Sequence, residues 1–231
     1  MPRETQAERK RRALRIVRAL AKAYPDAHCA LHFETPFQLL VATILSAQCT
    51  DQKVNEVTRV LFQRFGDAAA LADADPAEIE AIIRPTGFYR QKAKSILATS
   101  RALVEEHGGA VPKTLPELTA LRGVARKTAN VVLGTAFGIP GIAVDTHMTR
   151  VNQRLRLTDH DDPVHIEQDL MQLVPEPEWT AYTHRVIHHG RVCCDARRPR
   201  CETCPLRREC PWPGSGSAAA RKPTSRKGAA R

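Results

Sequence analysis

The sequence predicts an all-α protein of about ten helices. Apolar residues recur at helical spacing along most of the chain, and no run alternates between apolar and polar residues like a strand bounded by turns. Helix start signals precede several of these segments. In Asp75-Pro76 and in Thr114-Leu115-Pro116, a capping residue is followed by a proline in the first turn. The predicted fold class therefore rests on periodicity and capping together.

The expected helices differ in how much of their surface is apolar. The first carries Ile16, Val17 and Leu20 on one face, which predicts an amphipathic helix. The second is apolar nearly all round and should be buried. The third is expected to begin at Thr50 or Asp51. The expected helices span about residues 5–23, 37–47, 51–65, 76–83, 88–106, 115–120, 126–137, 146–154, 162–173 and 176–189.

Length and charge limit the class of protein. At 231 residues the chain can hold one large domain or two small ones. Its net charge is +10, and much of the excess lies in residues 1–12 and 212–231, where it could hold a polyanion without specificity. No unbroken apolar run reaches about 18 residues and no signal segment opens the chain, so we expect a soluble, cytoplasmic protein without membrane contact. The basic segment 213–231 is rich in Gly, Ser and Ala and is expected to be disordered.

Four cysteines near the C-terminus are the clearest candidate metal ligands. Cys194, Cys201, Cys204 and Cys210 follow the pattern C-x6-C-x2-C-x5-C. A zinc ribbon would show two separated CxxC pairs, and ferredoxin sequences use other gaps. Four thiolates this close together can still enclose a compact iron–sulfur cluster, and a structural zinc would use the same ligands. The spacing alone leaves both metals open, and Cys193 is expected to pack beside the site as a spare thiol.

A short hairpin at residues 121–125, between two helices, predicts contact with nucleic acid. In a helix–hairpin–helix, backbone N–H groups of the turn and of the second helix point at a phosphate, and no base is read. Lys127 follows just inside the second helix. Taken alone, the pattern also fits a plain helical corner with a solvated or phosphate-binding Lys127, and the hairpin by itself favours that interpretation.

The spacing between Lys127 and Asp145 allows the two side chains to meet. A helix over 126–137 runs roughly 18 Å, and the seven-residue return can span at most about 25 Å. Asp145 can therefore come back beside Lys127, and it can also cap the helix expected at 146–154. An amine attacks carbon only when neutral. Burial, the dipole of its own helix and the adjacent Arg126 would all favour a neutral lysine.

Motifs spread along the chain resemble those of the endonuclease III family of DNA glycosylases. They are SAQCTD at 46–51, TGFY at 86–89, LRGVARKTANVVLGTAFG at 121–138, VDTHMTRV at 144–151 and the cysteine loop, in family order. The resemblance implies a six-helix barrel domain over 29–139, with its helix–hairpin–helix at 114–137. It also implies an iron–sulfur cluster domain built from 1–28 and 140–212, with the active site between the two domains.

The same resemblance implies the chemistry. Lys127 matches the family's nucleophile and Asp145 its partner, as in a bifunctional DNA glycosylase and AP lyase that excises oxidised pyrimidines from duplex DNA and cleaves the strand by β-elimination. The four cysteines match ligands of a 4Fe–4S cluster. Lys127 argues against an adenine-mismatch glycosylase, which lacks this lysine. Together with Asp145 it argues against a non-catalytic or redox-sensing iron–sulfur DNA-binding protein. A monomer that works on nucleoid DNA is expected.

Several further residues are expected at the DNA. Gln48 and Phe88 match the residues that the family inserts where the flipped base has left the stack. From the sequence alone, a solvated amide and a hydrophobic staple are the simpler interpretations of these two. The remaining expected DNA-binding residues are Arg122, Gly123, Val124, Ala125, Arg126, Arg197, Arg198 and Arg200, and the expected pocket residues are Asp51 and His147.

The chain departs from the family pattern at four positions. Arg122 stands where the family has Pro, Ala125 where it has the second hairpin Gly, Phe88 where it has Leu, and Cys49 where it has Ala. If the second hairpin Gly needs a positive φ, alanine there would cost about 1 kcal/mol. Arg122 could compensate with a phosphate contact. These departures leave the substrate range and the turnover open.

Overall fold

The structure, a computed structural model, describes residues 4–212. Within this range it is all-α, as predicted, with eleven α-helices, three short 3₁₀ helices and no strand. The basic tail expected at 213–231 lies outside the described residues. No helix in the described range is long and apolar enough to cross a membrane.

The helices are α1 (Gln6–Ala23), α2 (Pro36–Leu45), α3 (Asp51–Arg64), α4 (Ala68–Ala72), α5 (Pro76–Ile83), η1 (Arg84–Thr86), α6 (Tyr89–His107), α7 (Leu115–Ala120), α8 (Arg126–Ala136), α9 (Thr146–Arg154), α10 (Pro163–Leu173), η2 (Glu176–Glu178), α11 (Trp179–Val192) and η3 (Cys201–Thr203).

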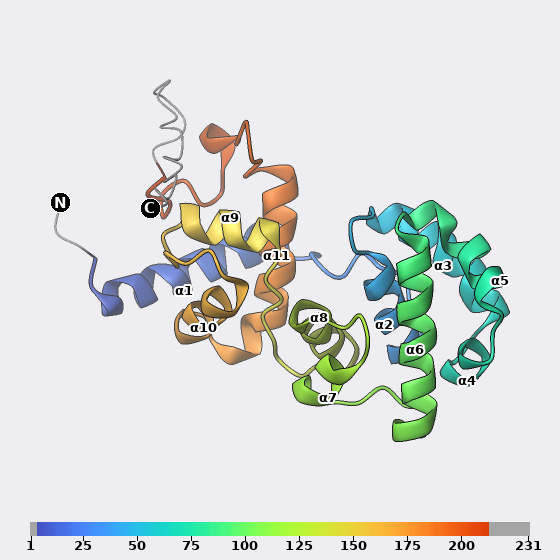
Figure 1. Ribbon diagram of the computed structural model, residues 1–231. Coiled ribbons are helices and arrows are strands. Elements are labelled where there is room, and N and C mark those ends of the chain that lie inside the picture. Colours follow the sequence, from blue (N-terminus) through green and yellow to red (C-terminus); the bar gives the residue numbers. More distant parts are fainter. Residues whose placement is uncertain (1–3, 213–231) are drawn as a thin grey trace, which may run out of the picture.

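The helices pack around two hydrophobic cores (Figure 1). The first core takes its residues from the segment between Leu31 and Leu133, which holds α2 to α8. The second joins α1 to α9, α10 and α11. In Figure 1 the blue α1 lies among the yellow and orange helices, although these come from opposite ends of the sequence. The start of the chain therefore completes the core of its C-terminal part.

Helix α2 forms the centre of the first core. Every residue from Phe37 to Leu45 is buried, which confirms the burial predicted from its apolar surface. Helices α3, α6 and α8 pack against it. Helix α8 carries Lys127, the predicted nucleophile. It therefore packs against a helix whose residues from Phe37 to Leu45 are all buried.

The predicted start signals are helix caps in the structure. The side chains of Thr50, Asp75 and Thr114 each accept a hydrogen bond from a backbone N–H in the first turn of α3, α5 and α7. The last predicted helix differs, since its first residues form η2 and α11 ends later than expected. Helix α4, capped by Asp67, was not predicted, because an Ala-rich segment this short shows no helical period.

Helix α11 contacts helices of both cores. It packs against α1 and α9 in the second core and against α8 from the first. Figure 1 shows α11 standing beside α9 and next to α8. The end of α11 lies against the start of α9, where Gly190 contacts His147, and the beginning of α11 lies against Gly134 near the end of α8.

Candidate active site and metal centre

The hairpin between α7 and α8 requires glycine at position 123. Gly123 has a φ of +81°, and a Cβ at this position would lie 2.8 Å from both Cβ and Oγ of Ser95 on α6. One turn further along α6, the Thr99 hydroxyl donates to the carbonyl oxygen of Arg122 at 2.7 Å. The hairpin backbone is thereby held against α6, while the side chain of Arg122 is exposed.

Ala125 is unstrained, in contrast to the cost considered for an alanine here. Its φ of −81° and ψ of 165° are ordinary extended values. Ala125 is the N-cap of α8, and it offers no side-chain acceptor to the first N–H groups of the helix. These N–H groups and the positive end of the helix dipole can therefore serve an anion. The start of α8 is suited to a phosphate oxygen.

Lys127 and Asp145 both stand at helix starts. Lys127 is the second residue of α8, and its side chain is exposed. Burial, one of the three factors considered for this lysine, therefore does not act on it here. Asp145 is the N-cap of α9, where its Oδ1 accepts the backbone N–H of Met148 at 2.8 Å. The predicted cap of this helix is confirmed.

Charged side chains gather around Arg191 of α11. Its Nη1 lies 2.9 Å from Oδ2 of Asp51, the first residue of α3. Burial raises the pKa of the Cys29 thiol, the charge of Asp51 raises this pKa further, and the charges of Lys127 and Arg191 lower it. Such charge effects fade quickly with distance in salt water. Asp51, Lys127 and Arg191 therefore all act electrostatically on the Cys29 thiol, and Asp51 and Arg191 are in direct contact.

His147 interacts with both Arg191 and Asp145. Burial lowers the pKa of His147, the charge of Asp145 raises it, and the charges of Arg150 and Arg191 lower it. Nη2 of Arg150 lies 3.0 Å from Nδ1 of His147 and also donates to a backbone carbonyl of α11. Asp51 and His147, the two expected pocket residues, thus both interact with Arg191, which was not among the expected pocket residues.

Gln48 and Phe88 lie on two exposed turns with a left-handed backbone. Their φ values are 53° and 48°, and the Phe88 residue is 69% exposed. Among residues 4–212, only three residues other than glycine have a positive φ. This conformation costs energy that the surrounding structure must supply. The large exposure of Phe88 does not fit a hydrophobic staple and is what insertion into DNA requires.

Lys92 of α6 ties these two turns together. It is 5% exposed, and its Nζ donates to the carbonyl oxygens of Leu45 and Thr86, both at 2.8 Å. Leu45 ends α2 shortly before Gln48, and Thr86 ends η1 shortly before Phe88. Burial lowers the pKa of Lys92. One buried amine thus fixes the separation of both turns.

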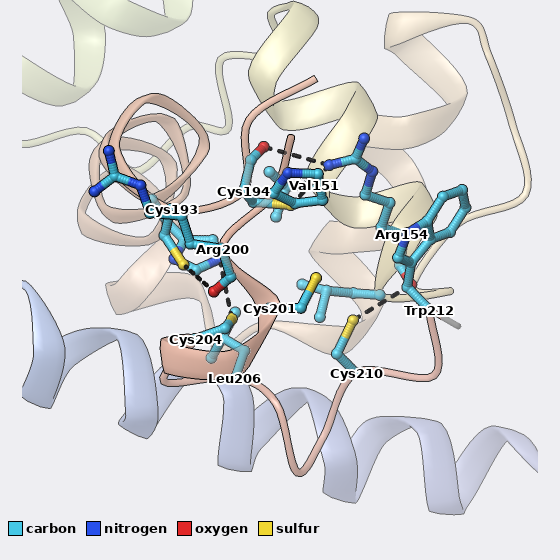
Figure 2. Close-up of a pocket in the computed structure, with 13 residues that line it drawn as sticks. Val151, Arg154, Cys193, Cys194, Arg200, Cys201, Cys204, Leu206, Cys210 and Trp212 are labelled. Carbon is cyan, nitrogen blue, oxygen red and sulfur yellow. Dashed lines mark hydrogen bonds between the residues drawn. The ribbon is translucent and has the colours of Figure 1, made fainter. Parts of the chain in front are cut away.

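The four predicted metal ligands line a single cavity together with Cys193 (Figure 2). Burial raises the pKa of Cys204 to about 12 and raises that of Cys210 as well. Such thiols stay protonated unless a metal charge displaces the proton. Ligand atoms of His189, Cys193 and Cys204 lie within 4.8 Å of one another. The thiols and the imidazole that line this cavity fit a thiolate-bound metal centre. The close group includes Cys193, which was expected to be a spare thiol, and His189, which the spacing pattern did not mark.

Arg154 of α9 holds the first part of the cysteine loop (Figure 2). Its Nη1 donates to Sγ of Cys194 at 3.2 Å and to the carbonyl oxygen of Asp195 at 2.7 Å. Its Nη2 donates to the carbonyl oxygen of Ala196 at 2.8 Å. The guanidinium lies over the ring of Trp212, 5.1 Å from the centroid. An N–H group directed at sulfur stabilises a thiolate and tunes a metal bound to it.

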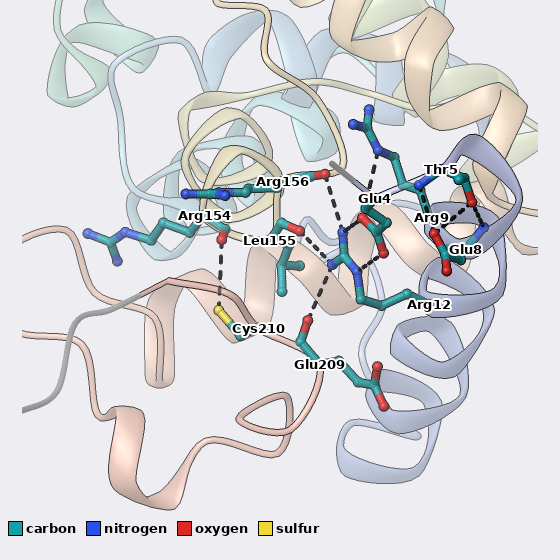
Figure 3. A network of polar contacts seen from close by, with 10 residues as sticks. All are labelled: Glu4, Thr5, Glu8, Arg9, Arg12, Arg154, Leu155, Arg156, Glu209 and Cys210. Atoms are coloured by element: carbon teal, nitrogen blue, oxygen red, sulfur yellow. Dashed lines mark hydrogen bonds and ion pairs between the residues drawn. The ribbon is translucent and has the colours of Figure 1, made fainter. Parts of the chain in front are cut away.

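Arg12 of α1 holds the other end of the loop (Figure 3). Its guanidinium binds both carboxylate oxygens of Glu4 at 2.8 Å. It also donates to the carbonyl oxygen of Leu155, the C-cap of α9, at 2.6 Å and to that of Glu209 at 3.2 Å. Arg15, one turn further along α1, binds the Glu209 carboxylate at 2.9 Å. Because Glu209 directly precedes Cys210, α1 fixes the position of the last cysteine.

The three arginines between the first two cysteines are exposed on an ordered loop. Oδ1 of Asp195 accepts the backbone N–H groups of Arg197 and Arg198 at 2.8 and 2.9 Å. The backbone N–H of Arg200 donates to the carbonyl oxygen of Cys193 at 2.9 Å. A loop already held in one conformation can present guanidinium groups to phosphates with little further loss of entropy.

Known proteins similar to this chain identify its family. Residues 41–176 match the HhH-GPD superfamily of base excision DNA repair proteins. The chain is 55% identical over 206 residues to endonuclease III of Synechocystis sp., and the match covers 89% of this chain and 94% of that protein. An identity this high over nearly the whole length confirms the resemblance predicted from the motifs.

Two solved structures share the fold. One is a non-covalent endonuclease III–DNA complex, with a TM-score of 0.83, 44% identity, and coverage of 87% of this chain and 95% of that chain. The other is a trapped covalent endonuclease III–DNA intermediate, with a TM-score of 0.84, 43% identity and the same coverage. The chain therefore belongs to the endonuclease III family of HhH-GPD base excision DNA repair proteins, the DNA glycosylases with AP lyase activity.

Proposed function

We propose that the chain excises damaged bases from duplex DNA with Lys127 as the nucleophile and Asp145 as its partner. The observation that carries this assignment is the place of Lys127, exposed in the first turn of α8 directly after the hairpin. The Gly123 turn and the uncapped N–H groups of α8 suit a phosphate there. A phosphate bound at the start of α8 would bring a deoxyribose close to Lys127.

The reaction begins with a damaged nucleotide flipped out of the duplex. The neutral Nζ of Lys127 attacks C1′ of the sugar, the bond from C1′ to the base breaks, and the base leaves with the electron pair and a proton. Opening of the sugar ring gives a Schiff base. Loss of a proton from C2′ then expels the 3′ phosphate, which cleaves the strand, and water releases the lysine.

Asp145 acts in one of two ways. It accepts the proton that Lys127 loses, or it stabilises the positive charge that develops at C1′ as the base departs. Its Oδ1 is used by the N-cap bond to Met148, and a carboxylate has a second oxygen for the reaction. The cap orients the carboxylate, so the structural and the chemical role are compatible.

The DNA is held by groups that make no distinction between sequences. We propose that the hairpin N–H groups, Arg122 and the loop arginines Arg197, Arg198 and Arg200 bind phosphates. Gln48 and Phe88 fill the space left by the flipped nucleotide, and their exposure and left-handed backbone support this role. Family resemblance supports oxidised pyrimidines as the bases removed.

For the cofactor, we propose that Cys194, Cys201, Cys204 and Cys210 hold a 4Fe–4S cluster. The shared cavity, the N–H group that Arg154 directs at Cys194 and the family assignment support it. The cluster would stiffen the basic loop. A brown protein with visible absorbance and iron is expected on purification. A colourless protein that contains only zinc would overturn this cofactor.

Borohydride trapping tests the nucleophile. Borohydride reduces a Schiff base to a stable amine, so wild-type protein incubated with a duplex that carries an abasic site should become covalently attached to DNA. Lys127→Ala should give no adduct, while Lys22→Ala, at an exposed lysine of α1, should trap like the wild type. No adduct with wild type, or full trapping by Lys127→Ala, would refute the assignment. Excision of adenine from a mismatch without trapping would favour the monofunctional type.

We also propose that the two cores mark two domains. One is the barrel over 29–139, and the other is the cluster domain formed by 1–28 and 140–212. The separate sets of core residues support this division. We expect the protein to act as a monomer on nucleoid DNA in the cytoplasm, and light scattering during gel filtration tests the oligomeric state.

A further inference from the structure

Glu167 of α10 has a buried carboxylate that accepts hydrogen bonds from side chains in the first turns of α8. It is 3% exposed. Its Oε2 accepts Nε–H of Arg126 at 2.7 Å, and its Oε1 accepts Nη2–H of the same guanidinium at 3.0 Å, which makes a bidentate pair. Oε1 also accepts Nδ2–H of Asn130 at 3.2 Å. Arg126 and Asn130 lie one helical turn apart, so Glu167 binds one face of α8.

The same Asn130 amide holds the segment that returns from α8 to α9. Its Nδ2 also donates to the carbonyl oxygen of Ile142 at 3.0 Å. A Cβ at Gly141 would lie 3.0 Å from Oδ1 of Asn130, so the backbone passes directly against this side chain. Ile142 lies in the chain shortly before Asp145, the N-cap of α9. Glu167 and Asn130 therefore attach the return segment to the start of α8.

Stability is a weak explanation for this ion pair. The Glu167 side chain is 4% exposed and that of Arg126 is 42% exposed. Removing the carboxylate from water costs free energy that can exceed what its attraction to Arg126 returns, and apolar side chains of similar size often stabilise a protein as well. A bidentate pair adds a defined distance and orientation. Arg126 directly precedes Lys127, so any shift of the backbone at Arg126 moves Lys127 with it.

We propose that Glu167 is a positioning residue that sets the distance between Lys127 and Asp145. It acts on Lys127 through Arg126, and on Asp145 through the return segment. This inference rests on the proposed catalytic pair. Attack on a sugar carbon depends on alignment, so a displacement of about 1 Å reduces the rate of the covalent step. The phosphate contacts of the hairpin and the cysteine loop, which supply the DNA affinity, remain in place.

The test separates the covalent step from DNA binding. Glu167→Gln keeps the size of the side chain and removes its charge. Single-turnover borohydride trapping is measured with saturating abasic duplex, and affinity is measured with a duplex that carries a tetrahydrofuran analogue. We expect trapping to slow about tenfold or more, with unchanged affinity. Glu178→Gln is the matched control, because Glu178 pairs with Arg185 at 2.8 Å at the start of α11, and it should match the wild type in both measurements.

The possible results separate the positioning role from the role of the nucleophile. A folded Glu167→Gln variant that traps at the wild-type rate, or one whose weaker affinity accounts for its slower trapping, overturns the positioning role. If Glu167→Gln does not fold, the double variant with Arg126→Met removes both charges together, and it should fold and show the slow trapping. Trapping by Lys127→Ala would instead overturn the nucleophile itself. Full trapping by Glu167→Gln beside an inactive Lys127→Ala refutes the positioning role alone.

Discussion

Arg191 and Asp51, far apart in the sequence, form an ion pair of 2.9 Å that joins α11 to α3. Helix α3 contributes to the first hydrophobic core and α11 to the second, so the pair bridges the two. Its side chains are 49% and 26% exposed, and such pairs contribute at most about 1 kcal/mol to stability. Because Asp51 is one of the expected pocket residues, we expect the pair to matter more for the reaction than for stability.

Replacing Arg191 by Gln should slow base removal about tenfold while the free energy of unfolding changes by less than about 1 kcal/mol. Without Arg191, the carboxylate of Asp51 loses the ion pair that orients it at the start of α3, and Asp51 is one of the expected pocket residues. Single-turnover excision and urea unfolding measure the two effects. Arg185→Gln, on the same helix, should leave excision unchanged. Equal rates for the Arg191→Gln variant and the wild type would contradict the proposed role of this charge.

The hairpin should tolerate change at position 125 and not at position 123. Gly123→Ala forces an L-residue to a φ of +81° and brings its Cβ to 2.8 Å from Ser95, so it should cost at least roughly 1–2 kcal/mol and weaken DNA binding. Ala125→Gly should change the free energy of unfolding by only a few tenths of a kcal/mol. Urea unfolding and fluorescence anisotropy with duplex DNA compare the two. Similar losses of stability and of DNA affinity in both variants would contradict the requirement for glycine at position 123.

Replacing Lys92 by Met should cost about 1–3 kcal/mol, because the carbonyl oxygens of Leu45 and Thr86 would stay buried without a donor. In the folded variant the turns of Gln48 and Phe88 would lose their common anchor. We expect a smaller fluorescence rise from 2-aminopurine placed beside an abasic analogue, since this signal reports unstacking. Lys94→Met, at an exposed position of α6, should change neither property. A normal fluorescence rise in folded Lys92→Met would refute the anchoring role.

The stability of the protein should fall as the pH drops below about 6.5, in part because of His184. Burial lowers the pKa of His184 from its ordinary value of 6.5, and the charge of His28 lowers it further. Between 6.5 and the lower folded value, the unfolded chain binds a proton that the folded chain does not bind, so the free energy of unfolding decreases as the pH falls. His184→Gln should flatten this part of the curve in urea unfolding. An unchanged slope would mean that other groups cause the decrease.

Local sequence determined the features whose causes lie within a few residues. Thr50, Asp75 and Thr114 cap their helices through N–H groups two or three positions away, so a short pattern contains the whole interaction. The spacing of the cysteines likewise predicted a set that lines one cavity. The motifs also sufficed to predict the family.

Tertiary structure decided the features whose partners are distant in the sequence. Glu167 meets Arg126 across 41 residues and Lys92 meets Leu45 across 47, and no local pattern marks either contact. The hairpin shows the same limit, because the sequence could not tell which of its positions needs a positive φ. The approach of α6 makes Gly123 that position and leaves Ala125 in an ordinary conformation. A residue's φ and its buried partners depend on which segments fold against it, and that information is spread over the whole chain.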